Sequence, residues 1–336
     1  MQNEAEKLSQ KIFEANNKTF NAICLEVFQF QFDNNPLYRN FCQLLKRIPG
    51  EVRHCENIPF LPIGFFKLHQ VKCTSFNPQA VFESSGTTGT ATSRHFIKDL
   101  SLYERSFLTA FNLFYGEPGE YCILGLLPSY LERGNSSLVY MVKKLIDLSK
   151  NLNSGFYLDN YPELARVLLE NVKSGTKTIL IGVTYALIDF SEKFPMDLSS
   201  VIVMETGGMK GRKKEMLRNE VHDFLKGQWE VEHVHSEYGM TELLSQAYSK
   251  GEGLFISPPW MKVLCRDEDD PLGVSAPGVA AKGGANIIDL ANLFSCSFIA
   301  TDDLARCNPD GSFEVEGRLD HSDLRGCNLM FSPRAS

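Results

Sequence analysis

Apolar side chains recur at helical spacing through the first part of the chain, from Glu4 to about Leu45. Positions three, four or seven apart lie on one face of an α-helix, so this spacing predicts helices. We assign them to packing against the rest of the protein rather than to chemistry. The apolar positions that carry the pattern are Ile12, Phe13, Phe20, Ile23, Val27 and Phe30.

Three later segments are apolar without interruption, at residues 121–127, 178–183 and 201–204. Such runs are typical of parallel strands that helices cover on both faces. Helical stretches separate and follow these runs, at residues 138–148, 163–172 and 213–225. The alternation of strands and helices predicts an α/β body with mixed or parallel sheets flanked by helices.

Shorter patterns complete the outline. Pro59 and Pro62 interrupt regular structure, and residues 80–83 after them form a short strand candidate. Residues 229–234 form a further apparent strand. Past residue 257 the chain breaks into short segments separated by Asp-Pro, Pro-Gly, Gly-Gly and Asp-Gly pairs. We predict an α/β core over residues 1–255, with a phosphate-type loop at 84–94, and a β-rich subdomain with a hinge-like tail over 256–336.

The composition is that of a globular protein. With 336 residues and 43% hydrophobic content, the chain can bury a large core. The formal net charge of −7 argues against nucleic-acid binding, which usually requires a basic face. The basic residues between Lys210 and Arg218 are local, and we interpret them as a solvated helix face.

The N-terminal sequence, the lengths of the apolar runs and the cysteines indicate the cellular compartment. The N-terminus lacks the basic start and apolar centre of a secretory signal, and no apolar run reaches the roughly 20 residues of a membrane span. The nine cysteines are scattered without a CxxC pair, which favours reduced thiols in a cytoplasmic protein without a transmembrane segment. A dispersed zinc site that uses Cys265, Cys296, Cys307 or a histidine stays an alternative to buried thiols.

The segment Val81–Thr90, with the sequence VFESSGTTGT, is rich in glycine and hydroxyl residues. Glycines let the backbone approach an anion closely, while hydroxyls and exposed amides donate hydrogen bonds to phosphate oxygens. Plain loops share this composition, so the motif alone leaves both readings open. The candidate phosphate-binding residues are Ser84, Ser85, Gly86, Thr87, Thr88 and Gly89.

Two further motifs carry candidate chemistry. Tyr238, Gly239, Thr241 and Glu242 offer a ring that can stack on a base, a glycine, a hydroxyl for a phosphate and a carboxylate for Mg²⁺. A turn that leads into a capped helix is the plain alternative. The third motif is the segment 301–304, which the hairpin signal at 308–312 links to residues 313–320.

Together and in this order, these motifs resemble the adenylate-forming superfamily of acyl-CoA synthetases, adenylation domains and luciferases. Residues 84–89 resemble its phosphate loop, 238–242 its Tyr-Gly-x-Thr-Glu motif, 301–304 its Thr-Gly-Asp-Leu motif and 317–320 its hinge motif. The fold implied is the large N-terminal domain of that superfamily. ATP and Mg²⁺ are the implied cofactors.

The resemblance also implies roles for single residues. Thr87 and Thr88 would contact ATP phosphates, Thr241 the α-phosphate and Glu242 the Mg²⁺ ion. Tyr238 would lie against adenine. The remaining implied contacts are Asp303 and Arg318 at the ribose, Gly207 and Gly208 in an adenine-contacting loop, and Tyr130, His235 and Gly239 around the acid pocket.

The chain departs from the superfamily pattern in three places. The loop lacks the usual lysine, so Arg94 is the candidate for its charge. Asp302 replaces the glycine of the Thr-Gly-Asp motif. The sequence stops at Ser336, soon after the hinge motif, so we expect the mobile C-terminal domain with its catalytic lysine to be absent.

Within the superfamily, the chain looks most like the acyl-protein synthetases of the bacterial luminescence fatty-acid reductase system. The matching segments are 82–89, 127–130, 205–212 and 324–327. In those enzymes an acid is activated as acyl-AMP and then passed to a cysteine near the C-terminus and on to a reductase. Cys327 is the matching cysteine here, and Arg325 lies two residues before it, where its charge would lower the thiol pKa.

The resemblance leaves three functional hypotheses. The first is activation of a carboxylic acid, with a fatty acid as the favoured class, followed by transfer to a thiol of Cys327 or of a partner such as an acyl-CoA reductase or an acyl carrier protein. The second is an acyl-CoA or aryl-CoA ligase of the phenylacetate type, with coenzyme A as acceptor. The third is a non-catalytic nucleotide- or acyl-binding protein.

Overall fold

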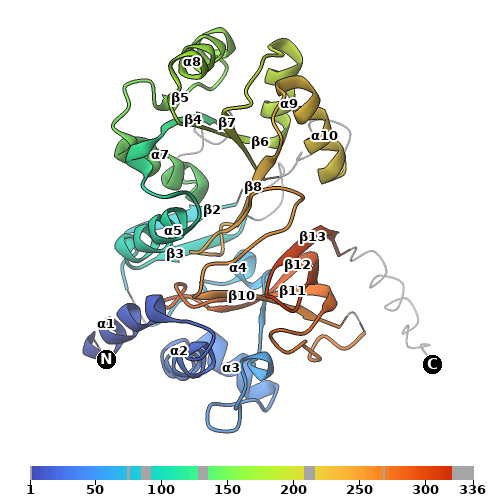
Figure 1. Ribbon diagram of the computed structural model, residues 1–336. Helices are drawn as coiled ribbons and strands as arrows, with labels where there is room; N and C mark the ends of the chain where they lie inside the picture. The colour runs from blue at the N-terminus through green and yellow to red at the C-terminus, as the bar shows by residue number, and fades with distance from the viewer. Residues whose placement is uncertain are drawn as a thin grey trace, which may run out of the picture.

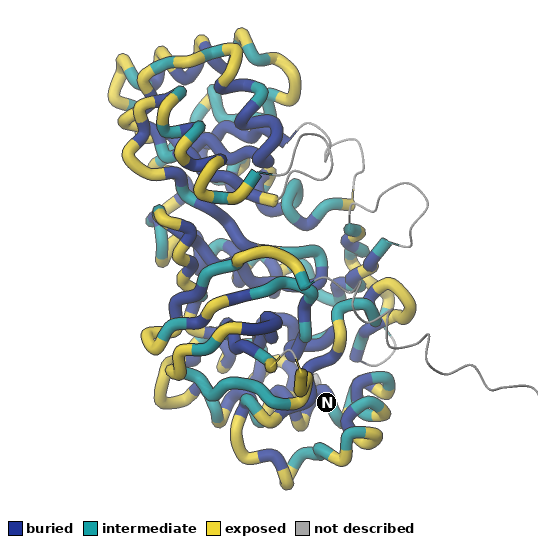
Figure 2. The backbone as a smooth tube through the Cα atoms, turned by 90° about the vertical axis from the view of Figure 1, so that its right-hand side faces the viewer, coloured by how far each residue is buried: buried dark blue, intermediate teal, exposed yellow. Residues whose placement is uncertain are grey.

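The computed structural model describes residues 2–73, 76–84, 92–127, 135–207, 216–267 and 269–319. It has two lobes, with a six-stranded sheet in the upper one and a five-stranded sheet in the lower one (Figure 1). A two-stranded hairpin and helix α5 lie between them in this view. Buried residues run through the interior of both lobes, and exposed residues follow the outer helices and turns (Figure 2).

The N-terminal region is helical, as its spacing predicts. It comprises α1 (Gln2–Lys11), the 3₁₀ turn η1 (Ile12–Glu14), α2 (Phe20–Asn34) and α3 (Pro36–Leu44). The Asn35 side chain caps α3 by accepting a hydrogen bond from the Tyr38 amide, and Pro36 occupies the first helical turn. Phe28 and Tyr38 both pack against Phe298 of the lower sheet, so these helices form part of its core.

The upper sheet has the strand order β5-β4-β6-β7-β8-β9, and all neighbours are parallel except β8 and β9. Its strands are β4 (Cys122–Leu126), β5 (Gly155–Phe156), β6 (Thr178–Val183), β7 (Val201–Thr206), β8 (Val234–Tyr238) and β9 (Ala247–Ser249). The three uninterrupted apolar runs are β4, β6 and β7. Every residue of β4 and β6 is buried, which confirms the predicted α/β body.

Helices cover both faces of this sheet. On one face lie α5 (Leu100–Tyr115) and α7 (Ser137–Ser149), and on the other lie α9 (Thr184–Lys193) and α10 (Arg218–Trp229). Two glycines show how closely the helices approach. A Cβ on Gly125 would lie 3.4 Å from Val142 of α7, and a Cβ on Gly182 would lie 2.7 Å from Leu187 of α9. Helix α8 (Tyr161–Ser174) completes the upper lobe.

Two boundary predictions are wrong. Residues 229–234 do not form a strand, because Trp229 is buried at the end of α10 and donates its indole N–H to the Phe194 carbonyl. Glu230 then adopts a left-handed conformation with φ 55°, which ends the helix, and the strand β8 starts only at Val234. The helix predicted from residue 213 begins at Arg218.

The lower sheet has the order β1-β12-β11-β10, with β13 also paired to β12. It contains β1 (Leu61–Pro62), β10 (Met261–Arg266), β11 (Ala281–Asp289), β12 (Phe298–Cys307) and β13 (Phe313–Arg318). The turn at 308–312 joins β12 to β13 as an antiparallel hairpin, so the β-rich C-terminal region is confirmed. Because β1 joins this sheet from the N-terminal half, the domain boundary at residue 255 stays a prediction.

The predicted strand at residues 80–83 is β2 (Ala80–Glu83), which pairs antiparallel with β3 (Arg94–Ile97). The remaining short elements are η2 (Cys55–Asn57), α4 (Phe65–Leu68) and η3 (Pro118–Glu120). Among the helices that the structure describes, none combines the length and the apolar character needed to cross a membrane.

Candidate functional site

At the base of the predicted phosphate loop, hydrogen bonds join the two ends of the loop. The Ser84 amide donates to the Ser93 carbonyl at 3.0 Å, and the Ser93 amide donates to the Ser84 hydroxyl at 2.9 Å. The next pair along this hairpin is Glu83 opposite Arg94. The loop therefore leaves β2 and returns to β3 at one point. Its predicted phosphate ligands Ser85, Gly86, Thr87, Thr88 and Gly89 lie outside the described residues.

Arg94 stands at the exit of the loop. Its side chain is exposed, and its guanidinium lies 5.7 Å from the ring centroid of Phe96, two residues further along the same face of β3. A cation over an aromatic face is held by the quadrupole of the ring, so Arg94 has a preferred resting position at the surface. Its predicted contact with a phosphate stays a prediction.

The second and third motifs meet at Tyr238. The Tyr238 hydroxyl donates to Asp303 Oδ2 at 2.7 Å, across 65 positions of sequence. The ring itself is buried and packs against both Phe255 and Phe313, with centroid distances of 5.8 Å and 5.6 Å. Burial raises the pKa of Asp303, while the hydrogen bond from Tyr238 lowers it in part.

Arg318 approaches the same carboxylate from the neighbouring strand. Asp303 and Arg318 are directly opposite each other in the β12–β13 ladder, and Arg318 Nε lies 3.7 Å from Asp303 Oδ1. The Arg318 side chain is 77% exposed, so this ion pair is a weak restraint and the guanidinium can turn toward a ligand. The structure thus brings together three predicted site residues, one from each of β8, β12 and β13.

Glu242 connects the second motif to the base of the loop. Burial raises the pKa of its carboxyl, and a hydrogen bond from Ser93 and the charges of Lys67 and Arg318 offset part of that rise. Glu242 therefore lies beside the loop base, and the positive charge of Arg318 acts on its carboxyl. Thr241, half-buried, precedes it in a turn that contains no helix, so the capped-helix alternative does not hold.

Asp289 fixes the main chain that follows this motif. It is fully buried at the end of β11, and its Oδ2 accepts hydrogen bonds from the Leu244 amide at 2.7 Å and the Ser245 amide at 3.0 Å. Its Oδ1 accepts a third from the Ser245 hydroxyl at 2.5 Å. No local sequence pattern singles out this aspartate, because it lies 44 residues from Ser245, whose amide it binds.

A buried cluster around Glu205 was also not predicted. Burial alone would raise the pKa of this carboxyl, yet the hydrogen bond with His222 and the charge of Arg218 bring its pKa below the usual value. The Thr184 hydroxyl bridges Glu205 Oε2 at 3.0 Å and the Gly207 carbonyl at 2.6 Å. The cluster orients the exposed Gly207, whose predicted contact with adenine stays a prediction; Gly208 lies outside the described residues.

For Arg218, the interpretation as part of a solvated helix face is wrong. Its Nε lies 3.2 Å from Glu205 Oε1, its guanidinium lies 4.9 Å from the Phe255 ring centroid, and it donates to the Val315 carbonyl at 3.3 Å. Its charge also acts on Tyr238 and Asp303. Arg218 is therefore a half-buried cation beside the meeting point of the two motifs, whereas residues 208–215 are not described.

The acid-pocket candidates are only partly placed. His235 is half-buried on β8, where its Nδ1 lies 3.2 Å from the Tyr115 hydroxyl of α5. Burial and the nearby charges of Lys250 and His233 lower its pKa to about 4. Gly239 is exposed at the strand end, where a Cβ would clash with Glu237 Oε1. Tyr130 and Cys327 lie outside the described residues.

The cysteines form no zinc site within the described part of the chain. Cys265, Cys296 and Cys307 are all buried as free thiols, and the sulfur atoms of Cys265 and Cys307 lie 3.3 Å apart. No group of three or more histidine, cysteine, aspartate or glutamate side chains is placed to bind a metal in the ranges that the structure describes.

Comparison with known proteins supports the resemblance. The family described as LuxE, acyl-protein synthetase, matches residues 6–116 of this chain. No curated protein sequence matches the chain. The match covers the N-terminal helices, the loop base and α5, but ends before the second and third motifs.

ATP-bound MatB shares the fold, and two further solved structures superpose less well. ATP-bound MatB from Rhodopseudomonas palustris superposes with a TM-score of 0.53 at 14% identity, over 71% of this chain and 48% of MatB. The long-chain-fatty-acid-CoA ligase FadD1 from Archaeoglobus fulgidus gives 0.47 at 16% identity, over 87% and 63%. The O-succinylbenzoate coenzyme A synthetase MenE from Bacillus subtilis gives 0.43 at 16% identity, over 71% and 49%.

The chain spans only 48% to 63% of the length of these three proteins. At these identities the likeness concerns the fold, and the superposition on MatB is the one that supports it. The α/β core with a β-rich end is thus confirmed as a fold that this chain shares with MatB. Residues 6–116 resemble the LuxE acyl-protein synthetases, as the motifs predict.

Proposed function

We propose that this protein activates a carboxylic acid with ATP and Mg²⁺, forming acyl-AMP and releasing pyrophosphate, and then passes the acyl group to a thiol. The observation that carries the proposal is the convergence of three motifs that lie far apart in the sequence. His95, two residues after the loop base at Ser93, lies 2.8 Å from the Thr241 carbonyl oxygen, and Tyr238 of the same motif donates to Asp303. The fold shared with ATP-bound MatB and the LuxE match agree with it.

The donor set suits magnesium held mainly by a nucleotide. Mg²⁺ in such sites keeps several waters and binds through one or two carboxylates together with substrate phosphates. Glu242 supplies one buried carboxylate whose pKa is raised by burial, so a nearby divalent charge would return it to the ionised form. When bound, the ion would neutralise charge on the phosphate oxygens.

The residues of the chain have defined tasks in this reaction. One carboxylate oxygen of the acid bonds to the α-phosphorus, and the bond between the α- and β-phosphates breaks in line with it. The Thr241 hydroxyl donates to an α-phosphate oxygen, and Arg94 with the loop hydroxyls binds the departing pyrophosphate. Asp303 accepts from the ribose hydroxyls, while Arg318 and the ring of Tyr238 line the sugar and base.

Transfer then requires a thiolate. Its sulfur bonds to the carbonyl carbon of acyl-AMP, the bond from that carbon to the AMP oxygen breaks, and AMP leaves with the electron pair. Cys327 is the proposed acceptor within the chain, and a partner thiol or coenzyme A is the alternative. A fatty acid is the favoured substrate class, with His235, Gly239 and Tyr130 proposed to line its pocket.

The test is carboxylate-dependent exchange of labelled pyrophosphate into ATP, with fatty, aryl and amino acids. Glu242→Gln keeps the side-chain volume but removes the charge, and we expect it to lower exchange at least about 100-fold. Glu232→Gln is the matched control, because the Glu232 side chain is 90% exposed, and it should leave exchange unchanged. Absence of exchange with every acid, despite ATP binding, would refute adenylation and favour the binding-protein hypothesis.

The acceptor is identified separately with a radiolabelled acid. Label on the protein that hydroxylamine removes, and that Cys327→Ser abolishes, identifies the internal cysteine. Label that appears only on added coenzyme A supports the CoA-ligase alternative. Full labelling of the Cys327→Ser protein would eliminate Cys327 as the acceptor.

A further inference from the structure

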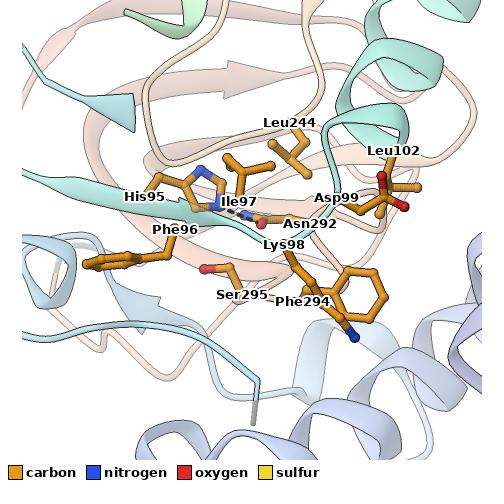
Figure 3. A pocket seen from close by; sticks show the side chains of 10 residues that line it. All are labelled: His95, Phe96, Ile97, Lys98, Asp99, Leu102, Leu244, Asn292, Phe294 and Ser295. Carbon is orange, nitrogen blue, oxygen red and sulfur yellow. Dashed lines mark hydrogen bonds between the residues drawn. The ribbon is translucent and has the colours of Figure 1, made fainter. Parts of the chain in front are cut away.

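His95 is a buried histidine that connects the phosphate-type loop to the Thr241–Glu242 turn. It lies on β3, two residues after the loop base at Ser93, and is 1% exposed. Its Nδ1 lies 2.8 Å from the Thr241 carbonyl oxygen, and its Nε2 lies 3.0 Å from Asn292 Oδ1. Figure 3 shows the ring of His95 directed at Asn292, with a dashed line between them.

Asn292 completes the clamp on the other residue of the turn. Its side-chain amide donates to the Glu242 carbonyl at 2.7 Å. Its own main chain is fixed, since the Asn292 amide donates to the Asp289 carbonyl at 3.0 Å and its carbonyl accepts from the Gln31 side chain at 3.0 Å. One side chain from β3 and one from the segment after β11 therefore hold two successive carbonyl groups of the motif.

The two contacts of the His95 ring depend on which of its nitrogen atoms carries a proton. A carbonyl oxygen only accepts, so Nδ1 of His95 carries a proton toward Thr241. Burial lowers the pKa of His95 to about 4, and the contacts with Thr241 and Asn292 oppose that change. The Thr241 contact is a hydrogen bond that His95 donates, and Asn292 acts on Glu242 through its own amide.

The pocket beside the ring leaves little room for rearrangement. Its volume is about 10 Å³, which is enough for at most one water molecule, and its lining includes Ile97, Leu244 and Phe294 (Figure 3). The Phe66 ring packs edge-on against His95 at 5.7 Å. Water cannot readily replace the imidazole donor in such a space, so loss of the ring leaves the Thr241 carbonyl without a partner.

We propose that His95 is a positioning residue for the acid-activation reaction: with Asn292, it holds the main chain of Thr241 and Glu242 so that their side chains face the reacting phosphate and its metal ion. The inference rests on the proposed function. His95 itself does not touch substrate. It acts through the turn. Because β3 begins at the base of the loop, His95 also holds the loop base and the Thr241–Glu242 turn in a fixed relative position.

The expected kinetic effect follows from this indirect role. Thr241 and Glu242 are proposed to act on charge that develops during phosphoryl transfer, so their displacement lowers kcat more than it raises KM for ATP. A shift of about 1 Å in catalytic groups can reduce the rate about 100-fold. We therefore expect His95→Leu to lower kcat for pyrophosphate exchange about 100-fold, with KM for ATP changed less than about threefold.

A conservative variant and a matched control separate positioning from stability. His95→Asn retains an N–H donor close to the position of Nδ1, near the Thr241 carbonyl, and should recover at least about tenfold of the lost kcat. Asn171→Leu also replaces a buried polar side chain by leucine, but in the upper lobe, where Asn171 donates to the Thr178 hydroxyl. At a similar loss of Tm, it should leave kcat within about twofold of the wild type.

Hydrogen exchange of the Leu244 and Ser245 amides gives a readout that does not depend on activity. Both amides donate to Asp289 at the end of the turn. His95→Leu should speed their exchange at least about tenfold, and Asn171→Leu should not. Unchanged exchange in His95→Leu, or an equal fall of kcat in Asn171→Leu, would overturn the inference. An inactive wild type would instead overturn the proposed function, while amide exchange would still decide whether His95 fixes the turn.

Discussion

Replacement of Glu237 by glutamine should change how the stability of the protein depends on pH. Glu237 is buried on β8, and its Oε2 accepts a hydrogen bond from the Thr206 hydroxyl of β7. Burial raises the pKa of this carboxyl to about 7, a rise that the Thr206 hydrogen bond opposes and the charge of Glu205 increases. Glutamine keeps the shape and the acceptor but cannot ionise.

The sign follows from proton binding. Between the usual pKa of 4.5 and the folded-state pKa of about 7, the folded protein holds a proton on Glu237 that the unfolded chain has released. The free energy of unfolding therefore falls as pH rises through this window, and the loss is complete above about pH 8. At 1.36 kcal/mol for each pH unit, the window corresponds to roughly 3 kcal/mol.

The assay is urea unfolding of the wild type and Glu237→Gln at pH 4.5, 5.5, 7 and 8. Other titrating groups are common to both proteins, so their difference in unfolding free energy isolates Glu237. The variant should gain roughly 3 kcal/mol relative to the wild type between pH 4.5 and 7, and nothing further above pH 8. A difference that is constant over this range would refute the assignment of a buried, proton-holding carboxyl.

Three other substitutions test the site. Gly239→Ala should lower the unfolding free energy by about 1–3 kcal/mol in urea, because its Cβ would clash with Glu237 Oε1; an unchanged value would contradict the packing. Tyr238→Phe should lower it by a similar 1–3 kcal/mol, since Asp303 loses its buried donor, and an unaltered midpoint would exclude this contact. Asp289→Ala should cost about 3 kcal/mol or more, measured the same way, because three donors lose their acceptor.

The architecture of the upper lobe is predictable from sequence because strands that are buried on both faces appear as uninterrupted apolar runs. Residues 178–183 read as one apolar run, and β6 has those same bounds. The start of β8 is not predictable in this way. Trp229 and Val231 are apolar and near a strand, but Trp229 belongs to the helix before it, and a left-handed Glu230 makes the break. Tertiary packing of one indole decides the boundary.

The candidate site likewise contains residues that can be predicted from sequence and residues that cannot. The motif residues Tyr238, Glu242 and Asp303 are recognisable because several chemically useful types lie close together in sequence. Asp289 and His95 are single polar residues within apolar segments, and each acts on a main-chain group more than 40 positions away. A local pattern cannot identify such residues, since their significance arises only when β3, β11 and the turn after β8 are assembled.

The two faces of β8 suggest how the proposed reaction is arranged. Side chains of a strand alternate between faces, and Tyr238 is directed at Asp303 on one face while His235 contacts Tyr115 of α5 on the other. In the proposed reaction, nucleotide and acid would thus approach from opposite faces of one strand. They would meet where the strand ends, at Gly239, where a side chain would clash with Glu237 Oε1. An in-line attack on the α-phosphate requires such an approach from opposite sides.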